Sequence, residues 1–272
     1  MGRVLVGAFV LASLLFTLIP IVLALLGSFK TNTELTVGAT FLPSRWEFST
    51  YARAWNEAHF AIFTWNSIYV SVLSSIGTVA VASMAAYAVD RVAFAGKRLF
   101  VAVQTGTMFV ALGAITLRPQ FDIMVGLHLN TSLAAVIILN ISNHAFAFLI
   151  LLGFMKGIPR DLDEAGRIDG AGFGTIYATI VMPLLLPGIG IVSLFAFRDA
   201  WNEYVMPLVF TLSQPRLQVL TVGLANLKYS PEGALQNNLM LAGACLSMVP
   251  MIVMFLLANK SFLQVNAGGL KG

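Results

Sequence analysis

Charged side chains are scarce in this sequence. Only 10% of its 272 residues are Asp, Glu, Lys or Arg, whereas 58% are hydrophobic. A soluble domain carries roughly a quarter charged residues. A surface with so few charges cannot face water over its whole area, so we expect lipid to surround much of the chain.

Three further absences exclude classes of site. The single cysteine, Cys245, excludes an intrachain disulfide, and the net charge of +4 is spread over loops rather than gathered into a nucleic-acid-binding face. His59, His128 and His144 are too scattered for a zinc site. Gly96-Lys97 lacks the upstream glycine and following hydroxyl of a loop that holds ATP phosphates. We therefore expect no cofactor, metal or nucleic acid on this chain.

Apolar runs dominate what remains. A helix needs about 20 apolar residues to cross a bilayer core of about 30 Å, and six stretches approach that length. They predict an all-α integral membrane protein with six transmembrane helices. The first run, preceded by Arg3, also resembles a signal peptide, but its length favours a retained helix. The expected helices cover residues 4–26, 66–89, 99–117, 132–155, about 176–203 and 239–257.

An even number of spans places both termini on the same side of the membrane. Basic residues concentrate in short cytoplasmic loops, and here they are densest on the side that holds the N-terminus. This bias predicts that both termini are cytoplasmic. The basic residues expected inside are Arg3, Arg91, Lys97, Arg98, Lys156, Arg160, Arg167, Lys260 and Lys271.

The segment from Lys156 to Pro187 is the most polar connection in the chain. Pro159 ends the preceding helix, and Asp161 with Glu164 has the spacing of a capping box. These signals predict a short helix at residues 162–171. Glycines at 166, 170 and 174 predict a flat track on which something packs closely. A helix lying on lipid headgroups should be basic with large apolar anchors, so this acidic, small-residue helix favours docking on another protein.

The same residues carry a family resemblance. Glu164-Ala165-Gly166, then Asp169-Gly170-Ala171, followed by Ile180 and Pro183, resembles the EAA loop of binding-protein-dependent ABC importer permeases. Gly166 stands where that family usually has alanine. Trp201-Asn202-Glu203 and the terminal Gly-Gly-Leu-Lys-Gly resemble the carbohydrate branch, specifically the smaller, six-helix permease of the maltose type.

The resemblance implies one transmembrane permease domain over residues 1–272, with a core at about 64–258, the EAA loop at about 156–176 and a cytoplasmic tail at 259–272. It also implies a second permease, an ATPase dimer that uses ATP and Mg²⁺, and an extracytoplasmic solute-binding protein. The residues implied in ATPase coupling are Asp161, Glu164, Ala165, Gly166, Arg167, Asp169, Gly170 and Ala171, with Gly268, Gly269, Leu270, Lys271 and Gly272 of the tail.

Polar residues inside the spans are candidates for the substrate pathway, because they are costly in lipid. They are Asn140, Asn143, His144, Trp201 and Asn202. Hydrogen bonding between helices is the alternative for the first three. A polyol, sugar phosphate or amino acid remains an alternative to a sugar. A stand-alone proton-coupled carrier would need an intramembrane acid–base relay, and Arg198, Asp199 and Glu203 are better explained as an ion-paired helix end. A membrane-embedded enzyme would need a catalytic cluster, which we do not find.

Overall fold

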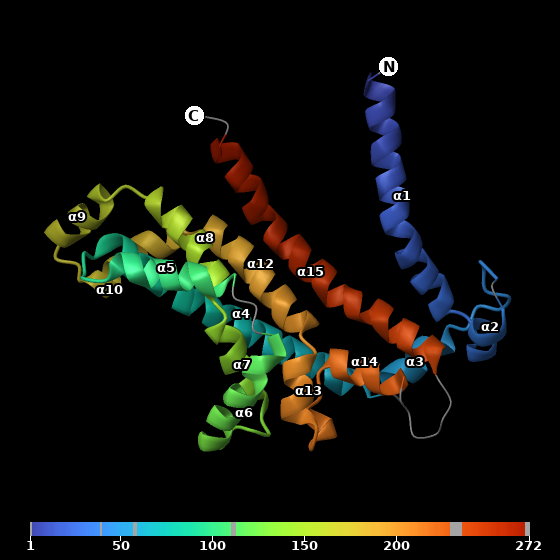
Figure 1. Cartoon of the computed structure of the whole chain (residues 1–272). Coiled ribbons are helices and arrows are strands. Elements are labelled where there is room, and N and C mark those ends of the chain that lie inside the picture. Colours follow the sequence, from blue (N-terminus) through green and yellow to red (C-terminus); the bar gives the residue numbers. More distant parts are fainter. Residues whose placement is uncertain (1, 39, 57–58, 110–112, 229–235, 270–272) are drawn as a thin grey trace. The chain divides into compact units, whose positions relative to one another are not determined.

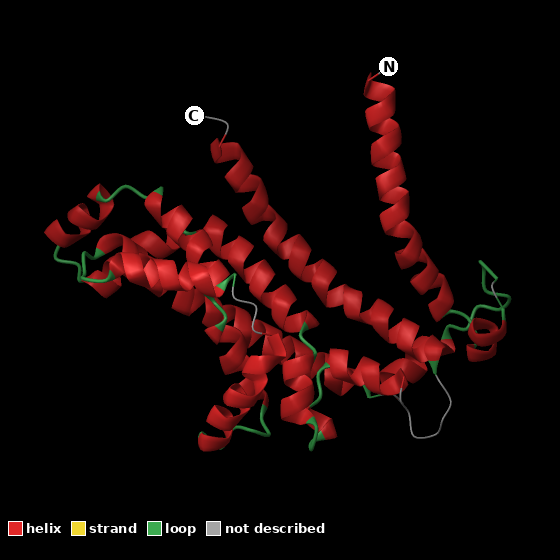
Figure 2. Ribbon diagram, viewed as in Figure 1, coloured by secondary structure: helices red, strands yellow, loops and turns green. Residues whose placement is uncertain are grey.

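The computed structural model describes residues 2–38, 40–56, 59–109, 113–228 and 236–269. Within these ranges every regular element is a helix (Figures 1 and 2). Helices suit a lipid-facing chain because they satisfy their backbone hydrogen bonds internally. The prediction of an all-α membrane fold is therefore confirmed.

Three long helices are apolar enough to cross a membrane. They are α1 (Gly2–Ser28), α4 (Phe60–Arg91) and the part of α15 (Asn237–Gly269) that ends at Ala258. Each contains one of the predicted spans. The last of them is longer than expected, because helical backbone continues to Gly269 through most of the segment predicted as a tail.

Two further spans are broken rather than straight. Helices α7 (Leu133–Ser142) and α8 (Ala145–Lys156) meet at an angle of 48°. The segment of α10 (Phe173–Ile176), a π-helix (η2, Tyr177–Val181) and α11 (Met182–Leu184) meets α12 (Leu186–Asn202) at 81°. The bend predicted from Pro183 and Pro187 is present. Each proline stands in the first turn of the helix that follows a break, because a proline cannot continue the preceding helix without a clash.

The predicted helix at 99–117 is not continuous in the described residues. Helix α5 (Lys97–Thr107) is followed by a 3₁₀ turn (η1, Gly113–Thr116) and α6 (Leu117–Gly126). The expected end at Arg118-Pro119 was wrong, because both residues lie in the first turn of α6, where proline costs no hydrogen bond. The described chain thus offers three straight spans, or five counting the bent pairs, and the count of six is not confirmed.

One compact unit comprises Met1–Asn66 and Gln218–Pro250. Besides α1 it contains α2 (Asn32–Val37), α3 (Ser49–Asn56) and α14 (Leu220–Lys228). The ring of Phe29 lies 5.3 Å from Trp46 and 5.2 Å from Tyr51, centre to centre. The hydroxyls of Tyr51 and Ser28 are 2.7 Å apart. The aromatic residues after α1 therefore pack on one another.

The second unit comprises Ser67–Leu217 and Met251–Gly272. Here α8 packs against α5 and α12, and α7 packs against α13 (Val205–Thr211). The 3₁₀ turn η3 (Pro215–Leu217) ends the first of its two segments. Its core centres on fully buried side chains of α8 and the segment after α9, among them Phe148, Leu151, Met155, Val181 and Leu185. This unit holds both candidate sites.

Candidate coupling and translocation sites

The polar segment after α8 folds into helix α9 (Asp161–Ile168), which lies at one end of its unit (Figure 1). Asp161, Asp163 and Glu164 occupy its first turn, where negative charge is favoured by the helix dipole. The capping box predicted from Asp161 was wrong. Arg160 is the N-cap residue with helical backbone angles, and no side chain caps the helix, because a capping side chain needs an extended backbone at that position.

Helix α9 ends in a Schellman motif. The N–H of Ala171 donates to the Gly166 carbonyl at 2.9 Å, and that of Gly170 donates to the Arg167 carbonyl at 3.0 Å. This closure requires a left-handed residue after the helix, and Gly170 has φ of +82°. The Asp-Gly-Ala part of the motif is thus a helix stop, which explains its glycine structurally.

The predicted glycine track is not present. Gly170 belongs to the helix stop, and a Cβ built on Gly174 would meet open space. Only Gly166 makes a close approach: a Cβ there would lie 3.0 Å from Cγ1 of Ile176 and 3.1 Å from Cδ1 of Ile180. The close packing is therefore between α9 and the next segment of the same chain.

The two faces of α9 differ in exposure. Asp163 and Gly166 are its buried residues. Leu162, Ala165 and Ile168 are exposed at successive turns, and Ile168 is 86% exposed. Asp161, Glu164 and Arg167 are also exposed and flank this apolar row. The outward face thus combines an apolar ridge with charged edges.

A buried ion pair ties α9 to the end of α4. Nε of Arg91 lies 2.8 Å from Oδ2 of Asp163, and the two side chains are only 3% and 5% exposed. Nη1 of Arg91 also contacts Asp90 Oδ2 at 2.7 Å, and the Tyr87 hydroxyl donates to Asp163 Oδ1 at 3.1 Å. Breaking a buried pair by removing one partner costs about 3–5 kcal/mol, so α9 is firmly attached.

Sequence reasoning missed this attachment. The predicted helix ended at residue 89 and left Asp90 and Arg91 in the loop that follows, whereas both belong to the buried network. A partner 72 positions away along the chain leaves no local spacing signal. The one available hint was that α4 ends on adjacent opposite charges in an otherwise apolar run.

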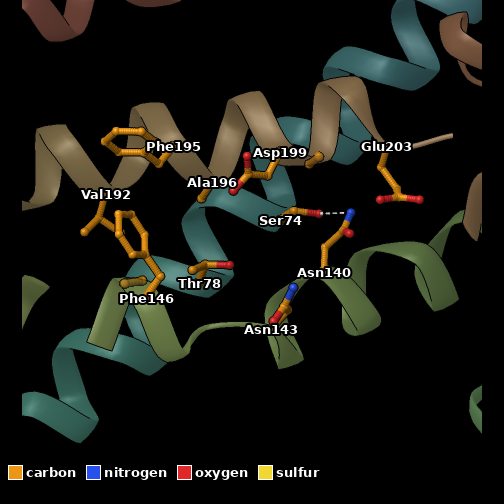
Figure 3. A pocket seen from close by; sticks show the side chains of 12 residues that line it. Ser74, Thr78, Asn140, Asn143, Phe146, Val192, Phe195, Ala196, Asp199 and Glu203 are labelled. Atoms are coloured by element: carbon orange, nitrogen blue, oxygen red, sulfur yellow. Dashed lines mark hydrogen bonds between the residues drawn. The ribbon is translucent and has the colours of Figure 1, made fainter. Parts of the chain in front are cut away.

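A cavity of about 100 Å³ lies between α4, α7, α8 and α12 (Figure 3). Its polar lining comes from Ser74 and Thr78 of α4, Asn140, Asn143, and the carboxylates Asp199 and Glu203. Asn143 sits at the break between α7 and α8. Irregular backbone at membrane depth is tolerated where it lines a water-filled cavity or is buried in protein, which fits this position.

Of the five predicted pathway residues, Asn140 and Asn143 line the cavity. Asn140 also donates to Ser74 Oγ at 3.3 Å. His144 instead stands at the N-cap position of α8 without a side-chain cap bond. Its Nδ1 lies 3.1 Å from the Ile141 carbonyl, and its Nε2 lies 3.4 Å from Nε2 of Gln104. Trp201 is buried with its ring stacked 5.7 Å from Phe197, and Asn202 is exposed, donating to the Arg198 carbonyl at 2.9 Å.

The remaining predicted residues complete the placement. Arg198 pairs with Asp199 at 2.7 Å, as expected for an ion-paired helix end. Gly268 and Gly269 close α15, while Leu270, Lys271 and Gly272 lie outside the described residues. Among the residues that the structure places, no group of three His, Cys, Asp or Glu side chains could hold a metal ion.

Several known proteins are similar to this chain in sequence and in fold. A sulfoquinovosyl glycerol transport system permease of Agrobacterium fabrum is 32% identical over 97% of this chain and 93% of its own length. The chain belongs to the carbohydrate ABC transporter permeases. A trehalose/maltose transport system permease of Thermococcus litoralis is 30% identical, covering 98% of this permease and 95% of the relative. No family model matches.

The fold of the permease recurs in a solved transporter. One chain of a bacterial ABC transporter involved in alginate import superposes with a TM-score of 0.78 at 24% identity, covering 95% of this permease and 94% of that chain. The predicted family and the type of fold are therefore confirmed.

Proposed function

We propose that this permease forms half of the pathway of a sugar or oligosaccharide importer and couples to a cytoplasmic ATPase dimer through α9. The observation that carries the proposal is the outward face of α9. Leu162 and Ile168 present apolar surface beside Glu164 and Arg167, on a helix whose inner face is fixed by a buried ion pair. An apolar helix ridge with charged edges suits a groove on another protein.

The docking surface comprises the residues of the motif that point outward. Gly166 supports it from below through its contact with Ile176, and Gly170 ends the helix. The outward residues are Asp161, Glu164, Ala165, Arg167 and Asp169. We assign the C-terminal segment 259–272 to a second ATPase contact. Both termini and α9 then lie in the cytoplasm, as the distribution of basic residues favours.

The cavity supplies the substrate side of the proposal. Asn140 and Asn143 can donate to and accept from sugar hydroxyls, and Phe146 and Phe195 add aromatic surface. Ligand pockets usually measure about 300–1,000 Å³, so a cavity of about 100 Å³ is too small for an oligosaccharide. A second permease would complete it.

The relatives favour a sugar over a polyol, sugar phosphate or amino acid. Their names include trehalose/maltose and diacetylchitobiose uptake systems. An extracytoplasmic binding protein would deliver the substrate, as suggested by a solved alginate transporter in complex with its pentasaccharide-bound periplasmic protein. ATP and Mg²⁺ would bind the ATPase, because this chain lacks the phosphate-binding loop.

Charge reversal at Glu164 tests the docking. We expect Glu164→Lys to reduce transport by the complete transporter in proteoliposomes to background, because it replaces a docking carboxylate with a cation. Gly170→Val should act similarly, since its φ of +82° costs a side chain about 1–2 kcal/mol and would misplace the end of α9. Asp122→Lys, which reverses an exposed carboxylate on α6, is the matched control. Normal transport by both test variants would refute the docking.

A further inference from the structure

Helix α4 contacts both candidate sites. Ser74 and Thr78 in its middle line the cavity, and Tyr87, Asp90 and Arg91 at its end hold the loop that carries α9. At 1.5 Å per residue, the 17 steps from Ser74 to Arg91 span about 25 Å. One unbroken helix therefore connects the cavity to the proposed docking surface.

Arg91 fixes α9 from two directions. Its Nε pairs with Asp163 inside α9 at 2.8 Å, while Nη2 donates to the carbonyl of Ile158, just before α9, at 3.1 Å. The Nε contact is an ion pair outside hydrogen-bond geometry, whereas the Nη2 contact is a directional hydrogen bond. Together they hold the loop close to the end of α4. Arg160 adds a bond from the loop back to the Asp90 carbonyl at 3.0 Å.

The segment after α9 is bound to the same face of α4. The Tyr87 ring lies 4.4 Å from Phe173 and 5.2 Å from Tyr177, and the hydroxyls of Ser83 and Tyr177 are 2.7 Å apart. Ser83, Tyr87 and Arg91 are four residues apart, so they lie on one helical face. Contacts before, within and after α9 thus converge on the end of α4.

Helix α8 also lines the cavity through Phe146 and Ala147, but it ends at Lys156 and reaches α9 only through the loop at residues 157–160. The route through α12 is interrupted as well. Helix α12 contributes Val192, Phe195 and Asp199 to the cavity, but a π-helix and an 81° bend separate α12 from α9. Breaks between packed elements are where hinge motions concentrate. Displacement of α9 would therefore move α4 directly and α12 only through a bend.

We propose that α4 and α9 move as one body, with Arg91 and Asp163 as the positioning residues of their joint, so that displacement of α9 shifts Ser74 and Thr78 against α12. The joint lies between elements of one chain, and its two residues are not among those that line the cavity. This inference rests on the proposed docking of α9 on the ATPase. It identifies the element that transmits the motion, which docking alone does not.

The first experiment measures sugar transported per ATP hydrolysed by the complete transporter in proteoliposomes. We expect Asp163→Asn to leave ATP hydrolysis measurable and to lower that ratio by about tenfold or more, because the buried guanidinium loses its charged partner. A merely structural role would lower the amount of assembled transporter without changing the ratio. Asp122→Asn, which breaks the exposed Arg118–Asp122 pair, is the control. We expect it to transport as much sugar per ATP hydrolysed as the wild-type transporter.

Two milder variants decide the question if Asp163→Asn fails to assemble. Tyr87→Phe removes only the bond to Asp163 Oδ1, and Arg91→Lys keeps the charge but cannot reach Asp163, Asp90 and the Ile158 carbonyl as a rigid fork. Both are expected to assemble and to lower the transport ratio. If both variants, or an assembled Asp163→Asn transporter, carried as much sugar per ATP as the wild type, the proposal that Arg91 and Asp163 join α4 to α9 would be wrong.

The reversed pair Arg91→Asp/Asp163→Arg gives a complementary result. Recovery of the ratio above that of Asp163→Asn supports a joint based on this pair. Failure of the proposed function is distinguishable, because normal transport by both Glu164→Lys and Gly170→Val would refute docking. Lost transport in those two variants, with a wild-type ratio in the Asp163 and Arg91 variants, would refute the joint alone.

Discussion

Gly166 illustrates how one residue adapts a shared motif to this chain. The resembling family usually has alanine there, and glycine costs about 1 kcal/mol relative to alanine in a helix interior. In the structure the missing Cβ lets α9 rest on Ile176 and Ile180. Closer packing beneath the helix therefore compensates for the low helix propensity of glycine.

The closeness of that packing predicts the effect of added volume. Gly166→Val should lower the free energy of unfolding by about 1–3 kcal/mol, as overpacking does. Gly166→Ala should be near neutral, because about 1 kcal/mol of helix propensity offsets a shift of a few tenths of an ångström in the isoleucines. Thermal unfolding of the purified permease in detergent measures both.

Gly174 is the control for this series. A Cβ there meets open space, so Gly174→Ala should leave the midpoint temperature of unfolding unchanged or raise it. An unfolding midpoint for Gly166→Val equal to that of the natural chain would show that α9 can move away from Ile176 without cost.

Glu34 supplies a prediction on pH. Its Oε1 accepts from the Ser44 backbone N–H and the Thr40 hydroxyl, each at 2.9 Å. The Ser44 bond, aided by the Thr40 bond and the charge of Lys30, holds the pKa of Glu34 below its usual value of 4.5. Because the folded pKa is the lower one, the stabilisation is present above pH 4.5 and is lost as pH falls through the folded pKa.

Hydrogen exchange at Ser44, corrected for intrinsic rates, measures this loss. We expect protection to decrease as the pH falls below about 4.5, and Glu34→Gln to show no such pH dependence. Equal pH profiles for the two proteins would mean that ionisation of Glu34 does not hold the loop.

At the scale of elements, Pro183 explains the π-turn of Tyr177–Val181, which hydropathy does not predict. It has no N–H for the carbonyl four residues earlier, and its ring would collide with that carbonyl. The helix widens into the π-turn of Tyr177–Val181 just before it. This widening sets the direction from which Tyr177 reaches Ser83 and Ile176 reaches Gly166.

Pro183→Ala should therefore disturb the base of α9. With the hydrogen bond restored, the π-turn can close to an α-turn, which rotates the preceding residues by about 100°. We expect transport by the complete complex to fall while membrane insertion is unchanged. Pro20→Ala in α1, a proline inside a helix that continues without a break, is the matched control. Full transport by Pro183→Ala would show that the π-turn is not required.

At the scale of the whole molecule, the proposed function gives the permease half of a pathway and a coupling surface, and it assigns ATP hydrolysis to a partner subunit. We expect the purified chain alone in liposomes to show neither ATP hydrolysis nor counterflow of sugar. Both activities should appear only after the partner permease, ATPase and binding protein are added. Robust counterflow by the isolated chain would instead favour a stand-alone carrier.

Much of this organisation was determined by the sequence alone. Apolar runs of membrane length specify an all-α membrane fold because a lipid-facing backbone must bond to itself. The motif around Glu164, Asp169 and Gly170 indicated the permease family through its resemblance to the EAA loop, which is a pattern of neighbouring residues. Docking of this helix and the role of the 259–272 segment remain predictions.

Only the tertiary structure decided what lies beneath that helix and beside the pathway. The pairing of Arg91 with Asp163 and the convergence of Ser74, Asn143 and Asp199 on one cavity depend on chain segments far apart in sequence. The contact of Gly166 with Ile176 depends on how the chain turns between them. Hydropathy indicates whether a residue tolerates lipid, but it does not indicate which helices pack against each other. The breaks near Asn143 and Leu185 determine those contacts, because each redirects a span by an angle set by packing.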